Sequence, residues 1–114
     1  MEFRKESDLL GELEVPINAY YGVQTQRAIN NFKISNQYLS AYPEFIKALG
    51  YTKKGAAQTN FELGRLEESI YKAMITACDE VIAGKFDQEF PVDMIQGGAG
   101  TSINMNINEV VANR

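Results

Sequence analysis

The spacing of hydrophobic residues predicts that most of this chain is helical. Between Pro43 and Gly64, apolar residues recur three or four positions apart, as on one face of a helix: Phe45, Ile46, Leu49, Ala56, Ala57 and Phe61. Pro43 suits the first turn because its missing N–H would have no partner there, and Gly64 is a natural stop. Gly50 and Gly55 each lower helix propensity by about 1 kcal/mol relative to alanine, so we expect close packing or an interruption there.

A second helix is predicted from residue 66 or 67 to about Ala83, with Gly84 as its stop. Glu67 and Glu68 at its start complement the helix dipole, which explains them without a catalytic role. The apolar residues of this segment share one helix face: Ile70, Ala73, Met74, Ala77, Cys78, Val81 and Ile82. Its single cysteine is expected to be a small buried hydrophobe.

Shorter patterns precede and separate these helices. In GELEVP, charged and apolar residues alternate after a glycine, which predicts a short strand or hairpin within residues 3–16. Residues 19–32 are typical of a loop that leads into a short helix. Residues 34–42 show no sustained period and are interpreted as a connection, and residues 85–92 as an extended connection.

The segment from Gln96 to Arg114, QGGAGTSINMNINEVVANR, places a glycine-rich turn directly before a helical pattern that starts at Thr101. The first N–H groups of a helix have no partner inside it, and the helix dipole favours negative charge there. A substrate carboxylate could therefore bind these N–H groups and the Thr101 hydroxyl, while the glycines allow close approach. The apolar stripe of this helix consists of Ile103, Ile107, Val110 and Val111.

A simpler alternative exists for the same segment. Thr101 or Ser102 would only cap the helix, and the three glycines would form an ordinary tight turn. Two nucleotide-binding motifs are disfavoured. No lysine follows the glycines as in a Walker loop, and Ile103 stands where the dinucleotide pattern needs a third glycine.

Two further pairs of residues have both a functional and a structural interpretation. Asn104 and Asn108 lie one helical turn apart, so they could bond a ligand or a neighbouring loop as a pair, or they could satisfy buried polar groups. Tyr20 and Tyr21 could line a pocket, or they could plug the edge of a core with their hydroxyls in water.

Composition narrows the function classes. The 114 residues amount to one small domain, and the net charge of -4 with scattered basic residues argues against nucleic-acid binding. One cysteine and no histidine argue against an internal disulfide, a zinc site or any other metal site. No apolar run approaches the roughly 20 residues of a membrane span, and no signal-peptide core is present, so we expect a cytoplasmic location. The helical pattern is unfinished at Arg114, from which we expect a truncated chain.

Three blocks, GELEVP, AYYGVQTQRAINNF and QGGAGTSINMNINEVVANR, together resemble the N-terminal domain of the aspartase/fumarase superfamily. The resemblance implies a mainly α-helical domain over residues 1–114 with a short N-terminal strand or hairpin, and it implies that the central helical bundle and the C-terminal domain are absent. It implies a substrate-carboxylate role for Thr101 and adds Gly100 and Ser102 from the same loop as substrate-binding residues.

Within the superfamily, GAGTSI resembles the aspartate ammonia-lyase branch more than class II fumarases, where Ala99 is usually a serine; the NMNxNEV stretch is common to both. This resemblance implies elimination of ammonia from L-aspartate to give fumarate, without a cofactor, in a homotetramer whose sites combine several subunits. The catalytic serine base would lie on a loop beyond Arg114, so residues 1–114 alone would be inactive. The alternatives are a fumarase, another lyase of the superfamily, or a non-catalytic helical module that binds an anion.

Overall fold

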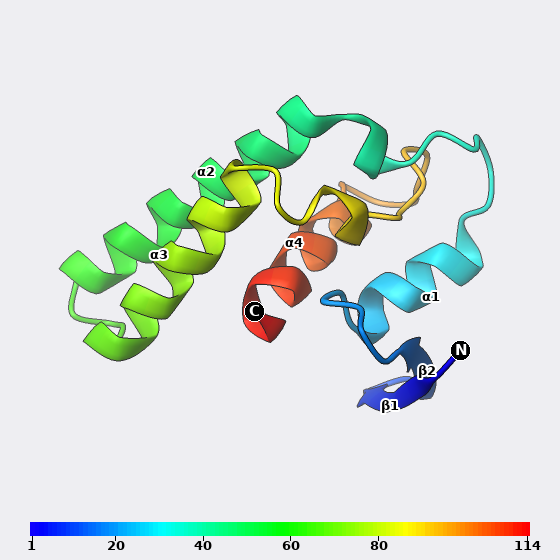
Figure 1. The fold of residues 1–114 in the computed structure, drawn as a ribbon, viewed down its shortest axis with the longest axis horizontal. Coiled ribbons are helices and arrows are strands. Elements are labelled where there is room, and N and C mark those ends of the chain that lie inside the picture. The colour runs from blue at the N-terminus through cyan, green and yellow to red at the C-terminus, as the bar shows by residue number, and fades with distance from the viewer.

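The computed structural model describes residues 1–114 as two strands, four α-helices and two short 3-10 turns. The elements are β1 (Phe3–Asp8), β2 (Gly11–Pro16), α1 (Val23–Asn31), a 3-10 turn (Leu39–Ala41), α2 (Pro43–Glu62), α3 (Glu68–Ile82), a 3-10 turn (Asp87–Glu89) and α4 (Thr101–Asn113). Figure 1 shows α2 and α3 side by side at one end, the β-hairpin with α1 at the other, and α4 between them. The expected class, mainly α with an N-terminal hairpin, is confirmed.

The β-hairpin is antiparallel, with Phe3 opposite Pro16 and Asp8 opposite Gly11. A two-stranded hairpin is marginal in water, so its attachment to the rest of the chain matters. Arg27 of α1 provides that attachment: its guanidinium bonds both carboxylate oxygens of Asp8, at 2.9 and 2.7 Å, and the carbonyl of Gly11. The hydrogen bond from Arg27 lowers the pKa of Asp8 below its ordinary value.

Helix α2 is continuous, so of the two alternatives expected at Gly50 and Gly55 the interruption is wrong. Gly50 is a close-packing point as expected, because a Cβ atom there would lie 2.7 Å from Cγ1 of Ile82 on α3. Packing between the helices thus outweighs the low helix propensity of glycine. Gly55 faces open space and has no packing role. Gly64 and Gly84 follow α2 and α3 with φ of +73° and +84°, as expected of helix stops.

The main core lies where the helical hairpin formed by α2 and α3 meets α1 and α4. Its buried members come from the four helices, the 3-10 turn Leu39–Ala41 and the segment before the glycine turn: Ala28, Leu39, Ile46, Val81, Phe90, Val92, Ile107 and Val110. Tyr20 and Tyr21 pack on this cluster while partly exposed, which agrees with the core-edge interpretation. The Tyr20 ring lies 4.8 Å from that of Phe86, centroid to centroid. None of the helices is both long and apolar enough to cross a membrane.

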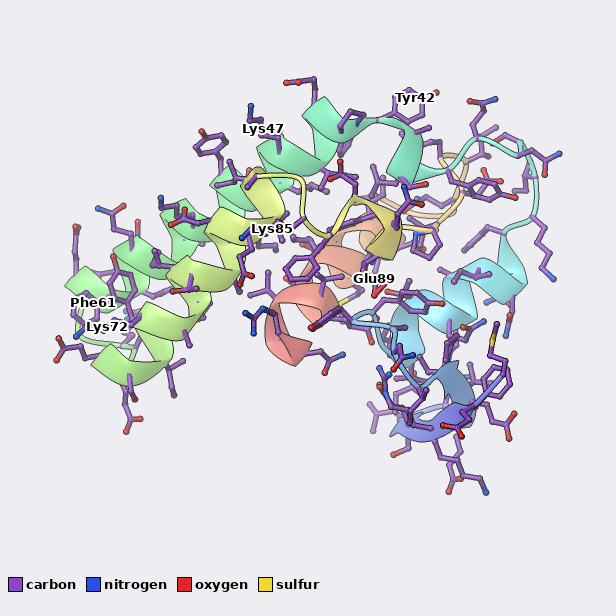
Figure 2. The ribbon with its side chains drawn as sticks, viewed as in Figure 1. Tyr42, Lys47, Phe61, Lys72, Lys85 and Glu89 are labelled. Atoms are coloured by element: carbon purple, nitrogen blue, oxygen red, sulfur yellow. The ribbon has the colours of Figure 1, made fainter.

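The segment 85–92 is not extended throughout, contrary to expectation. Asp87–Glu89 forms a 3-10 turn in which the Glu89 N–H donates to the carbonyl of Phe86 at 2.8 Å. This turn lets both Phe86 and Phe90 reach the core. Figure 2 shows Glu89 at the junction of the helical hairpin, α4 and α1, where its carboxylate accepts the Tyr20 N–H at 2.6 Å.

Candidate functional site

The glycine turn delivers the chain to α4 through two left-handed residues. Gly98 has φ of +77° and Gly100, the N-cap of α4, has φ of +82°, a region that side chains disfavour. The expectation that Thr101 or Ser102 caps the helix is wrong, because the N-cap residue is a glycine and makes no side-chain cap bond. The capping acceptor is instead Gln96, whose Oε1 accepts the Ile103 N–H at 3.0 Å.

Thr101 and Ser102 therefore retain unpaired donors. Their backbone N–H groups have no acceptor within the chain, and their hydroxyls form no hydrogen bond. Thr101 is exposed, while Gly100 and Ser102 are half-buried. The structure thus brings the three predicted residues together at one helix end, with N–H and O–H donors directed to no group of the protein itself.

The N-terminus of α1 shows what a carboxylate does with the same kinds of donor. Glu109 of α4 accepts the N–H groups of Gln24 and Thr25 at 2.9 and 2.8 Å, and the Thr25 hydroxyl at 2.6 Å. Glu6 of β1 accepts the Val23 N–H at 3.1 Å. Both carboxylates lie at the positive end of the α1 dipole, so they stabilise α1 while joining it to α4 and to the β-hairpin.

Asp93 anchors the segment that leads into the glycine turn. Its side chain, which is 1% exposed, accepts the N–H groups of Ile34, Ser35 and Ile95 at 3.1, 2.9 and 2.8 Å, and the Ser35 hydroxyl at 2.7 Å. Burial alone raises the pKa of Asp93, but these hydrogen bonds outweigh it and hold the pKa far below its ordinary value. The carboxylate is therefore charged at neutral pH.

Sequence reasoning missed the roles of Gln96, Asp93 and Glu109. A usable signal was the absence of a capping side chain before α1, where Gly22 is the N-cap, since a helix end without a local cap needs an acceptor from elsewhere. No comparable local signal points to Asp93, because the N–H groups it accepts from Ile34 and Ser35 lie almost sixty residues away in sequence.

The asparagines of α4 do not act as the expected pair within the chain. Asn104 is exposed and accepts a bond from Lys53 Nζ at 2.6 Å, whereas Asn108 donates to the Met105 sulfur at 3.8 Å. The buried polar role belongs to Asn106, which is fully buried and donates to the Glu89 carbonyl at 2.8 Å.

A larger hollow lies elsewhere, away from the glycine turn. A groove of about 940 Å³ separates the α2–α3 hairpin from the C-terminal half of α4, and mainly apolar side chains line it. Phe61 and Lys72 mark the outer end of that hairpin in Figure 2, away from the glycine turn. No group of three or more His, Cys, Asp or Glu side chains could hold a metal ion. Cys78 is buried as expected, and burial raises the pKa of its thiol.

Comparison with known proteins gives this geometry a context. Residues 11–114 match a family model described as "Lyase". The chain is 58% identical over 111 residues to an aspartate ammonia-lyase from Pseudomonas canavaninivorans, covering 97% of the chain and 23% of that enzyme. It is 53% identical to a class II fumarate hydratase from Halobacterium salinarum, covering 99% of the chain and 24% of that enzyme.

Solved structures agree with the sequence comparison. A crystal structure of fumarate lyase:delta crystallin from Brucella melitensis superposes with a TM-score of 0.95 at 48% identity, covering 97% of the chain and 26% of that chain. The chain spans about a quarter of the length of the relatives that it matches. Since the family model covers nearly all of the sequence and both comparisons agree, the chain belongs to the lyase family that includes aspartate ammonia-lyases and class II fumarate hydratases.

Proposed function

We propose that the protein containing this chain is an aspartate ammonia-lyase, which eliminates ammonia from L-aspartate to give fumarate. The observation that carries this proposal is the 58% identity to an aspartate ammonia-lyase across 97% of the chain. Residues 1–114 would form its N-terminal domain and supply a binding site for one substrate carboxylate at the start of α4. Thr101 would be the principal residue, with Gly100 and Ser102 beside it.

The free donors at α4 support this role. A carboxylate placed there would accept N–H groups from Thr101 and Ser102 and a hydroxyl bond from Thr101, as Glu109 does at α1. Hydrogen bonds to a charged group contribute about 1.5–3 kcal/mol each, and the helix dipole adds a favourable field. The left-handed turn at Gly100 leaves open space where a side chain would otherwise stand, since no atom lies within 4 Å of the Cβ position.

Such a site would assist the elimination itself. A base removes a proton from Cβ of aspartate, and the electron pair moves onto the adjacent carboxylate, which becomes a doubly charged aci-carboxylate. When that pair returns to form the carbon–carbon double bond, the bond from Cα to the protonated amine breaks and the amine leaves as neutral ammonia. Fixed donors bind the doubly charged intermediate more strongly than the ground-state carboxylate, so they lower the barrier to proton removal.

The base and the remaining substrate contacts are proposed to lie outside residues 1–114, on a flexible loop that carries a serine. Resemblance to the superfamily supports a homotetramer with a central helical bundle, sites shared between subunits, a cytoplasmic location and catalysis without a cofactor. On this proposal the isolated chain has no lyase activity.

The second candidate is a class II fumarate hydratase, favoured by the 53% identity to the Halobacterium enzyme. The test is to purify the whole protein that contains this chain and to follow fumarate formation from L-aspartate and from L-malate separately. Turnover of aspartate alone supports the proposal, and turnover of malate alone replaces it with the hydratase. Activity on neither substrate would leave another lyase of the superfamily or a non-catalytic anion-binding module, and activity of the isolated chain would contradict the proposed location of the base.

A further inference from the structure

We propose that Gln96 is a positioning residue, whose side-chain amide closes the glycine turn and sets the Thr101 and Ser102 donors in place for an anion. This inference rests on the proposed carboxylate role of the turn. The side chain makes two bonds in opposite directions. Its Nε2 donates to the Asp93 carbonyl at 2.9 Å, and its Oε1 accepts the Ile103 N–H at 3.0 Å.

The Gln96 side chain thus acts as a clamp between the Asp93 carbonyl and the Ile103 N–H. Its first end, at Asp93, is fixed to the body of the protein. The Asp93 side chain is held by Ile34, Ser35 and Ile95, and Asp93 pairs with Tyr38 in an isolated β-bridge. Backbone bonds flank the bridge: the Leu39 N–H donates to the Val92 carbonyl at 2.9 Å and the Met94 N–H to the Gln37 carbonyl at 2.8 Å. The Asp93 carbonyl is thus a rigid reference point.

The second end of the clamp fixes the helix. Between Gln96 and Ile103 lie three glycines, Ala99, Thr101 and Ser102, and no backbone N–H from residue 96 to residue 102 has an acceptor within the chain. A glycine-rich segment without internal bonds loses much conformational entropy when a ligand orders it. Closing it with the Gln96 side chain removes part of that cost before the ligand arrives, which raises affinity.

The amide is suited to this task because it is neutral and can both donate and accept. A glutamate could still accept the Ile103 N–H, but it could not donate to the Asp93 carbonyl. It would also place a negative charge at the positive end of α4, where it would repel an incoming carboxylate. Only one of the early N–H groups of α4 is consumed by Gln96, so Thr101 and Ser102 stay available.

Two substitutions in the whole protein, Q96A and Q96E, separate the hydrogen bond to Ile103 from the neutral charge of the side chain. Q58A is the matched control. Gln58 is exposed on α2 and its only side-chain bond, to Glu62, is 3.5 Å long. Hydrogen exchange read by mass spectrometry reports the Ile103 amide, with and without the unreactive dicarboxylate succinate. Kinetics on L-aspartate report KM and kcat, and thermal unfolding reports stability.

We expect Q96A to speed Ile103 exchange about tenfold, the effect of losing one ordinary hydrogen bond, and to raise KM about fivefold or more. Q96E keeps an acceptor for the Ile103 N–H, so we expect it to slow Ile103 exchange relative to Q96A. It loses the bond to the Asp93 carbonyl, so it does not restore thermal stability fully, and it raises KM further because its charge opposes the substrate. Q58A changes none of these quantities.

Each of the following results would overturn the proposal. Unchanged Ile103 exchange in Q96A would show that the clamp is absent. A KM within twofold of wild type in both variants would show that Gln96 does not position the donors. If both variants lowered kcat and thermal stability while KM stayed constant, the role of Gln96 would be merely structural. If the wild type turns over neither aspartate nor malate, the proposed function fails separately. Succinate protection that Q96A weakens then still supports the role of Gln96, and absence of that protection refutes it.

Discussion

The N-termini of α1 and α4 are built alike but are used differently. Each helix follows a glycine N-cap that makes no side-chain bond, and each carries a threonine in its first turn. At α1 the donors are taken by Glu109 and Glu6, from two other elements. At α4 the only intramolecular acceptor is a neutral amide, and it takes one N–H. The chain therefore supplies its own anion at one helix end and leaves the other available.

Space differs between the two ends as well as charge. A Cβ atom at Gly22, before α1, would lie 2.5 Å from a Glu109 oxygen and 2.8 Å from a Glu6 oxygen. A Cβ atom at Gly100, before α4, would meet nothing within 4 Å. The α1 end is thus a closed joint between the hairpin, α1 and α4, whereas the α4 end can admit a ligand. A helix N-terminus with its own carboxylate contributes stability, and one without it can contribute binding.

The largest expected effect comes from removing the internal anion. E109A deletes the acceptor of two N–H groups and of the Thr25 hydroxyl, and Thr25 is fully buried. Buried donors left unpaired cost about 1–3 kcal/mol each, so we expect a loss of about 3 kcal/mol in the free energy of unfolding. Urea unfolding of the 114-residue chain measures this. E62A, at an exposed position on α2, is the control and should stay within about 0.5 kcal/mol. A loss below 1 kcal/mol in E109A would show that the joint is not an important source of stability.

A second expected effect concerns Asp93, which anchors the segment before the glycine turn but lies outside the turn itself. D93N replaces a carboxylate that accepts four bonds with an amide that has only one acceptor oxygen, so it should destabilise the chain at neutral pH. The pKa of Asp93 is depressed in the folded state, so its contribution is complete above the ordinary pKa of about 3.9 and is lost as the pH falls below it. The difference in thermal midpoint between wild type and D93N should therefore shrink from pH 5 to pH 2. A constant difference across that range would contradict the charged role of Asp93.

Local sequence patterns predicted most of the fold and the part of the candidate site at the start of α4. Alternation in GELEVP predicted the hairpin, apolar spacing predicted the helices, and Gly64 and Gly84 marked the ends of α2 and α3. These features depend on neighbours within a few residues, which a sequence displays directly. The placement of Gly100, Thr101 and Ser102 at a helix start was predicted for the same reason.

The remaining features depend on contacts that no local pattern shows. Glu109 reaches Thr25 across 84 positions, and Asp93 reaches Ser35 across 58. Helix propensity alone left close packing and an interruption open at Gly50, and only the contact with Ile82 on α3 shows that α2 continues there. The turn at Asp87–Glu89 is too short to produce a recognisable period.

A smaller effect concerns the free hydroxyl of α4. T101V removes a donor that has no partner in the chain, so stability should change by less than about 0.5 kcal/mol. If that hydroxyl binds a substrate carboxylate, KM on L-aspartate in the whole protein should rise about tenfold, the equivalent of one charge-assisted bond. T101S should restore most of the affinity, and T52V, on the exposed face of α2, should leave KM unchanged. Loss of stability without a change in KM would indicate that Thr101 supports the fold and not a ligand.

The smallest expected effect tests whether the left-handed turn before α4, which leaves room for a ligand, depends on glycine for its stability. G100A meets no steric obstacle, but its φ of +82° costs an alanine about 1 kcal/mol, so the chain should lose about that much stability. G55A is its counterpart, because Gly55 also faces open space but lies inside α2, where alanine is favoured by up to about 1 kcal/mol. Urea unfolding should give shifts of opposite sign for the two variants. If G100A proves neutral, the turn has relaxed to a conformation that any residue can adopt, and the open space before Thr101 would then depend on Gln96 alone.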